Sequence, residues 1–304
     1  MWNEFMIIAV LFFSLGNMFA RMVRETDERY GVLKMIAALG AGAGVHAIFM
    51  LALGTRFFFG DLLRYLPTAL FYAVCAAIMM FGGRYVRSDL FGYSALSGAP
   101  VLILCLISGN TAGSGGSLLI HMAAAVLLIG ASAISFLPEA KKIASLSGNA
   151  DKKERALSIT IPVVFCIAAS LGRFFDGFMI VRRGRYGNAL SGYLDEASAL
   201  VAFDILIFTA GAAAIVYLAA LKRERIFTKE KTPALAAVGV CGTLGRFAYF
   251  YMIGGEAARA VPVISCCGIF ALIFRMIFLK KKPTPLDTAA LILASAGIIL
   301  TFAG

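Results

Sequence analysis

Charged side chains are scarce in this sequence. Only 15% of its 304 residues are Asp, Glu, Lys or Arg, whereas 61% are hydrophobic. A soluble domain of this size needs a charged, solvated surface, and so few charges cannot provide one. Apolar runs with one charge or none recur along the chain instead. This pattern indicates a helical membrane protein with many spans.

The sequence also lacks the features of a secretory signal and of common catalytic sites. Glu4 precedes the first apolar run and no Lys or Arg does, so we interpret that run as a span rather than a cleaved leader. No Gly-x-Ser-Gly or His-Glu-x-x-His motif and no pair of catalytic aspartates occurs. We therefore expect no catalytic residues, no cofactor and no enzymatic activity.

Cysteine is present in only six copies, and every copy falls within an apolar run. Cys266 and Cys267 are adjacent, and the others are widely separated. This distribution suggests neither a disulfide framework nor a metal site, so we expect no bound metal. Small apolar packing residues are the simplest interpretation of these cysteines.

What the sequence does contain is a series of apolar runs, each followed by a turn or a charged loop. They predict an all-α integral membrane protein of about ten transmembrane helices. The expected limits are 4–22, 33–54, 65–83, 90–108, 117–137, 159–181, 197–221, 233–254, 258–279 and 286–303.

Short motifs recur between the two parts of the chain. Ser14-Leu15-Gly16 in the first span returns as Ser170-Leu171-Gly172 in the sixth, and two weaker matches follow in the same order. This order favours a duplication. We expect a first five-helix repeat over 1–137, a cytoplasmic linker loop over 138–157 and a second repeat over 158–304. Because each repeat has an odd number of spans, the two repeats should be inverted in the membrane.

The net charge of +11 is explained by topology. Most of the 28 Lys and Arg residues fall in or beside the loops that join spans 1 and 2, 3 and 4, 5 and 6, 7 and 8, and 9 and 10. The positive-inside rule therefore places those loops in the cytoplasm and both termini outside. We therefore expect the bilayer, and not nucleic acid, to account for the basic charge.

An ionisable residue inside an apolar run costs at least about 2.5–3.5 kcal/mol, and four of those in this sequence form the leading candidate site. They are Arg173 and Asp176 in the sixth span, Asp204 in the seventh and Arg246 in the eighth. Counting residues along the helices places all four in one layer of the membrane. Two interpretations remain open: an ion network that locks the spans together, or the lining of a substrate cavity. We favour the cavity, because polar residues in transporter spans usually face one.

Further residues near these charges are candidates for the same site. Asn17 is the counterpart of Arg173 in the first repeat, and His46 follows the run Gly40-Ala41-Gly42-Ala43-Gly44. His46, Asp176 and Asp204 are candidates for a proton relay, although a neutral packed His46 is the simpler interpretation. Five aromatic residues could wall the pocket, or serve only as core or lipid contacts: Phe174, Phe247, Tyr249, Phe250 and Tyr251.

The last two spans resemble a known family. The ninth contains Ala260-Val261-Pro262-Val263 and ends in Lys280-Lys281-Lys282-Pro283-Thr284, and a span rich in small residues follows. This resembles the closing pair of helices in the EamA-like branch of the drug/metabolite transporter (DMT) superfamily. The uncharged loop 109–117 and the outward termini depart from the pattern.

The resemblance implies a ten-helix secondary active transporter in the cytoplasmic membrane, working by alternating access. We expect its partners to be lipid, a small polar substrate that is anionic or zwitterionic and could be amino-acid-like, and a coupling proton or other ion. We expect a monomer or weak homodimer. The alternatives are a non-transporting membrane scaffold or receptor and, less favoured, an intramembrane enzyme.

Overall fold

The computed structural model describes residues 2–26, 30–82, 120, 122–131, 133–134, 152–180, 194–265, 267–280 and 282–303. Within these residues the regular structure is helical, apart from one isolated bridge between Ile180 and Leu194. The predicted all-α class is confirmed for this part of the chain. The expected span at 90–108 lies outside the described residues.

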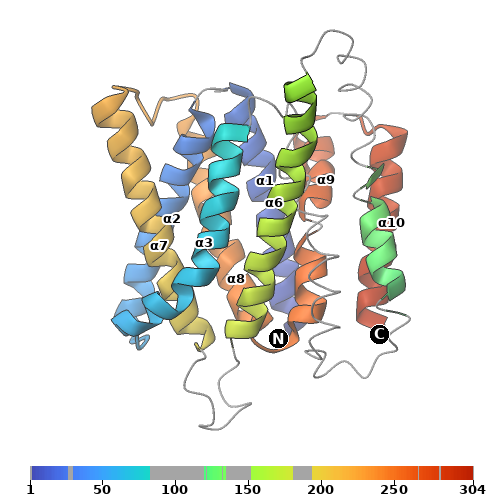
Figure 1. Cartoon of the computed structure of the whole chain (residues 1–304), viewed down its shortest axis with the longest axis horizontal. Helices are drawn as coiled ribbons and strands as arrows, with labels where there is room; N and C mark the ends of the chain where they lie inside the picture. Colours follow the sequence, from blue (N-terminus) through green and yellow to red (C-terminus); the bar gives the residue numbers. More distant parts are fainter. Residues whose placement is uncertain are drawn as a thin grey trace. The chain divides into compact units, whose positions relative to one another are not determined.

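The helices largely follow the apolar runs of the sequence, and Figure 1 labels them. They are α1 (Trp2–Thr26), α2 (Gly31–Ala52), α3 (Phe59–Gly82), α6 (Lys152–Met179), α7 (Glu196–Val216), α8 (Thr232–Ser265), α9 (Cys267–Leu279) and α10 (Pro285–Ala303). A five-residue π-helix, η2 (Tyr217–Leu221), continues α7. A shorter apolar helix over Met122–Ala131 lies within the span expected at 117–137.

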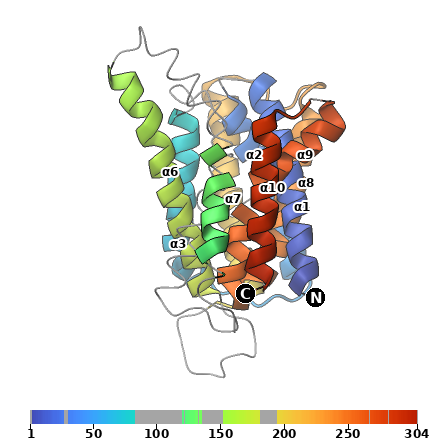
Figure 2. The ribbon, with the colours of Figure 1, turned by 90° about the vertical axis from the view of Figure 1, so that its right-hand side faces the viewer.

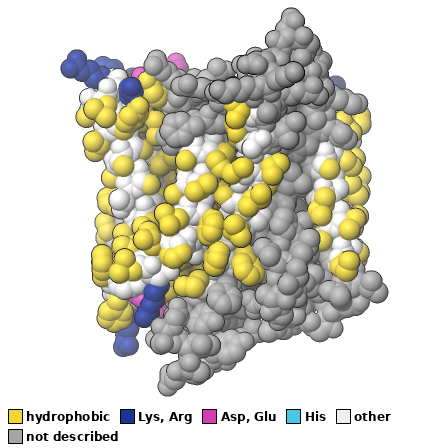
Figure 3. Space-filling model, in the orientation of Figure 1, with side chains coloured by type: hydrophobic (Ala, Val, Ile, Leu, Met, Phe, Trp, Pro, Cys, Tyr) yellow, Lys and Arg dark blue, Asp and Glu magenta, His cyan; other side chains and the backbone are white. Residues whose placement is uncertain are grey.

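Five of the described helices are long and apolar enough to cross a membrane. The qualifying segments are Glu4–Val23, Gly31–Ala52, Phe59–Ile78, Glu196–Leu221 and Thr232–Ile253. Large apolar side chains such as Leu63, Phe208 and Val216 remain exposed on them. Figure 3 shows hydrophobic side chains along the face where α7 lies, with Lys and Arg beyond its C-terminal end. Such a surface suits lipid. The count of ten helices and the inverted repeat remain predictions.

Two expected boundaries are wrong. Helix α6 begins at Lys152, inside the linker expected over 138–157, and α8 continues through the boundary expected near 255 to Ser265. Both extensions carry good helix formers, Lys152-Lys153-Glu154-Arg155-Ala156 and Glu256-Ala257-Ala258-Arg259-Ala260. The apolar pattern marks where a helix meets lipid, and a helix formed by such residues can extend beyond that point.

The chain forms two compact units, each drawn from two separate stretches of sequence. The first contains Met1–Ala69 and Asp176–Gly255, and the second contains Leu70–Phe175 and Glu256–Gly304. The domain limits predicted from the repeat stay a prediction. In the first unit α2 and α7 are in extensive contact, and Figures 1 and 2 show them side by side.

The second unit has two apolar clusters in its described residues. One joins Cys75 of α3 to Phe165, Ala168 and Ala169 of α6. The other consists of Leu128, Ala131, Ile269 and Ala294. Both clusters contain small residues, which let helices approach closely where no hydrophobic effect drives them together in lipid.

Candidate functional site

The glycine run of α2 determines how closely its neighbours in the first unit can approach. A Cβ on Gly40 would lie 2.6 Å from the Cα of Gly211 in α7, and one on Gly42 would lie 2.9 Å from the carbonyl oxygen of Gly239 in α8. No side chain fits at these contacts. Helix α2 therefore packs backbone to backbone against both α7 and α8. His46, one turn beyond Gly42 on α2, therefore lies beside α7 and α8.

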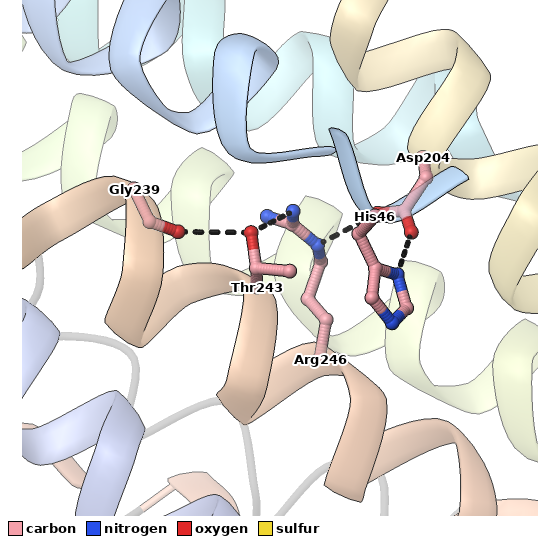
Figure 4. Close-up of polar contacts among 5 residues, drawn as sticks. All are labelled: His46, Asp204, Gly239, Thr243 and Arg246. Carbon is pink, nitrogen blue, oxygen red and sulfur yellow. Dashed lines mark hydrogen bonds and ion pairs between the residues drawn. The ribbon is translucent and has the colours of Figure 1, made fainter. Parts of the chain in front are cut away.

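Asp204 of α7 is fully buried and has a different partner on each oxygen (Figure 4). Its Oδ2 lies 2.6 Å from Nδ1 of His46, and its Oδ1 accepts a hydrogen bond from Nε of Arg246 at 3.3 Å. The side chains of His46 and Arg246 are only 13% and 8% exposed. A buried carboxylate is thus balanced by one buried guanidinium and bonded to one imidazole.

The guanidinium of Arg246 is held by its own helix as well. Its Nη2 donates to the hydroxyl of Thr243 at 3.3 Å, and that hydroxyl donates to the carbonyl oxygen of Gly239 at 2.9 Å (Figure 4). The guanidinium also lies over the ring of Phe203, 5.7 Å from its centroid. A cation over an aromatic face is attracted by the ring quadrupole. These contacts fix the fork in one orientation.

A second buried carboxylate lies in the same unit. Asp176 of α6 accepts a hydrogen bond from the hydroxyl of Tyr65 at 2.5 Å on one oxygen and from Tyr249 at 2.9 Å on the other. Asp176 and Tyr65 are both 0% exposed. Hydrogen bonds to a carboxylate are stronger than those between neutral groups, so this cluster joins α3, α6 and α8 firmly.

Three aromatic rings connect the two carboxylate clusters. The ring of Tyr65 lies 5.7 Å from that of Phe203 and 6.0 Å from that of Phe250, and the last two are 5.6 Å apart. Such separations fall in the favourable range for aromatic pairs. The first unit thus holds one continuous buried group of polar and aromatic side chains, reaching from His46 to Tyr249.

The structure brings together several of the residues that the sequence singled out. Asp204, Arg246 and His46 are in direct contact, and the ring of Phe247 meets that of His46 edge to face at 5.8 Å. Asp176 and Phe250 belong to the same unit, where Phe250 is buried. Asn17, on α1, is half-buried.

Arg173 and Phe174 belong to the second unit. Arg173 is half-buried, and the ring of Phe174 packs edge to face on Phe175 at 5.9 Å. The sequence therefore pointed to residues of both units. A role for Arg173 beside Arg246 stays a prediction.

Sequence reasoning missed three members of the group: Tyr65, Thr243 and Phe203. The first two are polar residues inside apolar runs, and this position is the signal that could have found them. It is a weak signal, because hydroxyl groups are far less costly in a span than charges. Within the described residues no cluster of three or more His, Cys, Asp or Glu side chains is placed to hold a metal ion.

Comparisons with known proteins agree with the resemblance seen in the sequence. Residues 192–303 match the model of the EamA-like transporter family, which is part of the DMT superfamily. Asp204, Arg246 and Phe247 fall inside the matched segment.

A crystal structure of another protein superposes over 98% of this chain and 98% of its own, with a TM-score of 0.66 and 14% sequence identity. At that identity the likeness shows a shared fold alone. No curated protein matches the sequence.

Proposed function

We propose that this chain, whose residues 192–303 match the model of the EamA-like transporter family, is a secondary active transporter of a small anionic or zwitterionic metabolite. It would work by alternating access in the cytoplasmic membrane, with both termini outside and ten spans in two inverted repeats. The observation that carries the proposal is the buried contact of Arg246 with Asp204 and His46. A membrane protein that needed only stability would be served by apolar side chains at these positions.

Arg246 is the residue proposed to bind the negative group of the substrate. A guanidinium presents a planar fork that matches a carboxylate or phosphate, and this one is already desolvated at 6% exposure. Thr243 and Phe203 hold the fork in place. Arg173 is proposed as a second anion ligand, and Asn17, Phe174, Phe247 and Phe250 as residues lining the cavity.

The two buried carboxylates, Asp176 and Asp204, are proposed to bind the positive charge that is transported with the anionic group. This charge is either a cationic group of the substrate or a proton. Asp176, bonded by Tyr65 and Tyr249, would meet a cationic group or carry a proton. Asp204 and His46 form the alternative proton-binding pair. A zwitterionic, amino-acid-like substrate would use an arginine and a carboxylate together.

The deciding experiment is flux into proteoliposomes that contain the purified full chain. A panel of small carboxylates, amino acids and phosphate esters is first screened by thermal shift, because binding stabilises the folded state by mass action. We expect at least one panel member to stabilise the protein and to exchange across the bilayer with saturation. Arg246→Lys keeps the charge and loses the fork, so it should weaken that flux about tenfold or more without loss of folded protein.

Two outcomes would contradict the proposal. If no panel member is transported although the protein is folded and oriented in the vesicles, a scaffold or receptor explains the chain better. Formation of a chemical product from a panel member would instead favour an intramembrane enzyme.

A further inference from the structure

Asp204 and the two side chains bonded to it, His46 and Arg246, form a small set of ionisable groups. Asp204 contributes one negative charge, Arg246 one positive charge, and His46 none while it is neutral. Within the described residues, Asp204 from α7 and Arg246 from α8 are the ionisable side chains bonded to His46 or to its partner carboxylate. The set is neutral as it stands, and an uncompensated charge at this depth would be costly.

A substrate anion that binds Arg246 upsets this balance. It must share or replace the bond between Nε of Arg246 and Oδ1 of Asp204, which at 3.3 Å is the longer of the two bonds of that carboxylate. Asp204 is then left with His46, and the buried set carries an extra negative charge. A single proton restores neutrality.

We infer that His46 is a proton-binding site, and that it takes up one proton whenever an anionic group occupies Arg246. The inference rests on the proposed transport function and names its coupling ion. Asp204 is in this view the internal counter-ion that the substrate displaces, and not a ligand of the substrate. By linkage, a proton on His46 equally favours binding of the anion.

The geometry of His46 suits this role. An ionised carboxylate can only accept hydrogen bonds, so Nδ1 of His46 must carry the hydrogen that is shared with Oδ2 of Asp204. The second nitrogen, Nε2, is then the acceptor that can take a proton, and Figure 4 shows it on the side of the ring away from Asp204. The ring is the most exposed of the three side chains, at 13%. Phe247 packs on this ring, with the two ring centroids 5.8 Å apart and the ring planes nearly perpendicular.

The balance of the cycle is simple. One anionic group enters from water and binds Arg246, and one proton enters from the same side and binds Nε2 of His46. Both leave to water on the other side, after which Arg246 returns to Asp204. No charge is left behind in the protein, and for a monovalent anion no net charge crosses the membrane.

The protonation state of His46 can be read without knowing the substrate. The chain has only two histidines, His46 and His121, so nitrogen NMR of the full chain labelled at histidine gives two sets of signals, and His121→Gln assigns them. Arg246→Gln removes the positive charge as a bound anion would neutralise it. We expect the ratio of protonated to neutral His46 at pH 7 to rise at least about tenfold over wild type. The reason is that the positive charge of Arg246, which disfavours a second positive charge on His46, acts through a low dielectric in this buried site. Arg246→Lys, which keeps the charge, should leave the ratio near that of wild type.

An unchanged His46 signal in folded Arg246→Gln overturns the inference. If that variant does not fold, Asp204→Asn provides the opposite change in charge, and His46 should then protonate at least about tenfold less readily. An unchanged signal there overturns it equally.

Proteoliposomes with a pH dye in the lumen complete the test. Uptake of a transported panel anion should acidify the lumen, whereas anion flux without proton movement refutes the coupling. Absence of any flux would refute the proposed function instead and would leave the NMR result standing.

Discussion

At the scale of single residues, substitution of Asp204 should have a large effect on stability, because its two carboxylate oxygens bind Arg246 and His46 separately. Asp204→Asn should lower the free energy of unfolding by about 3–5 kcal/mol, since it leaves the buried charge of Arg246 without its carboxylate. Thermal unfolding in detergent measures the loss.

The matched control for this change is an ion pair in the same unit whose arginine is exposed. Arg64 lies 3.6 Å from Asp61, three residues earlier on α3, and its side chain is 48% exposed. Arg64→Gln should therefore cost no more than about 1 kcal/mol. Equal losses for the two variants would show that the Asp204 contacts are not desolvated.

The hydroxyl of Tyr249 offers a second test at this scale. Tyr249→Phe keeps the ring and removes one of the donors to Asp176, which should destabilise the protein by about 1–3 kcal/mol. Tyr251 on the same helix stacks on Phe5 and Phe247, and its hydroxyl makes no hydrogen bond to the described residues. Tyr251→Phe should be nearly neutral, and a comparable loss there would refute the role given to the Asp176 contact.

At the scale of helices, the contact of α2 with α7 depends on glycine. A Cβ on Gly211 would meet the Cα of Gly40 at 2.6 Å, so Gly211→Ala must separate the two helices. We expect a loss of about 1–3 kcal/mol from overpacking. Because His46 and Asp204 lie on these two helices, the same change should weaken transport. Gly60→Ala on α3 meets nothing within 4 Å and should be neutral or slightly stabilising.

The end of α7 carries backbone strain. Arg223 follows η2 with φ at 52°, a conformation that favours glycine, and the next residue, Glu224, binds the buried Lys34 of α2 at 2.7 Å. Arg223→Gly should raise the free energy of unfolding by up to about 1 kcal/mol. At Arg225 φ is not positive, so Arg225→Gly should lower the free energy of unfolding slightly, because glycine raises the conformational entropy of the unfolded chain. Chemical denaturation compares the pair, and a loss at Arg223 would contradict the strain argument.

At the scale of the whole molecule, orientation is the open prediction. Single cysteines at Ser147 and at Gly304, in a background without the six native cysteines, should label from opposite sides of the membrane. An impermeant maleimide applied to intact cells and to inverted vesicles distinguishes the two sides. Labelling of both positions from one side would refute the topology of ten spans with outward termini. A native Cys241 restored alone should resist the reagent, because it is buried in α8.

The sequence by itself determined the class of the molecule. Long apolar runs must satisfy their backbone hydrogen bonds within themselves in lipid, so they become helices wherever they occur. The same rule made charges such as Asp204 and Arg246 conspicuous, because each is costly inside a span. These are local properties, and α1, α2, α7 with its continuation η2, and α10 lie within a few residues of their expected limits.

Only the tertiary structure decided which side chains meet. Asp204 finds His46 across 158 positions and Arg246 across 42, and Asp176 finds Tyr65 across 111. Residues so far apart in the chain are brought together by the rotation of packed helices about their axes and by their relative depth in the membrane. In this protein, contacts between small residues, such as Gly40 on Gly211, determine the rotation and the depth. A periodic pattern shows that a helix exists, but the partner of each buried charge depends on how closely the backbones approach.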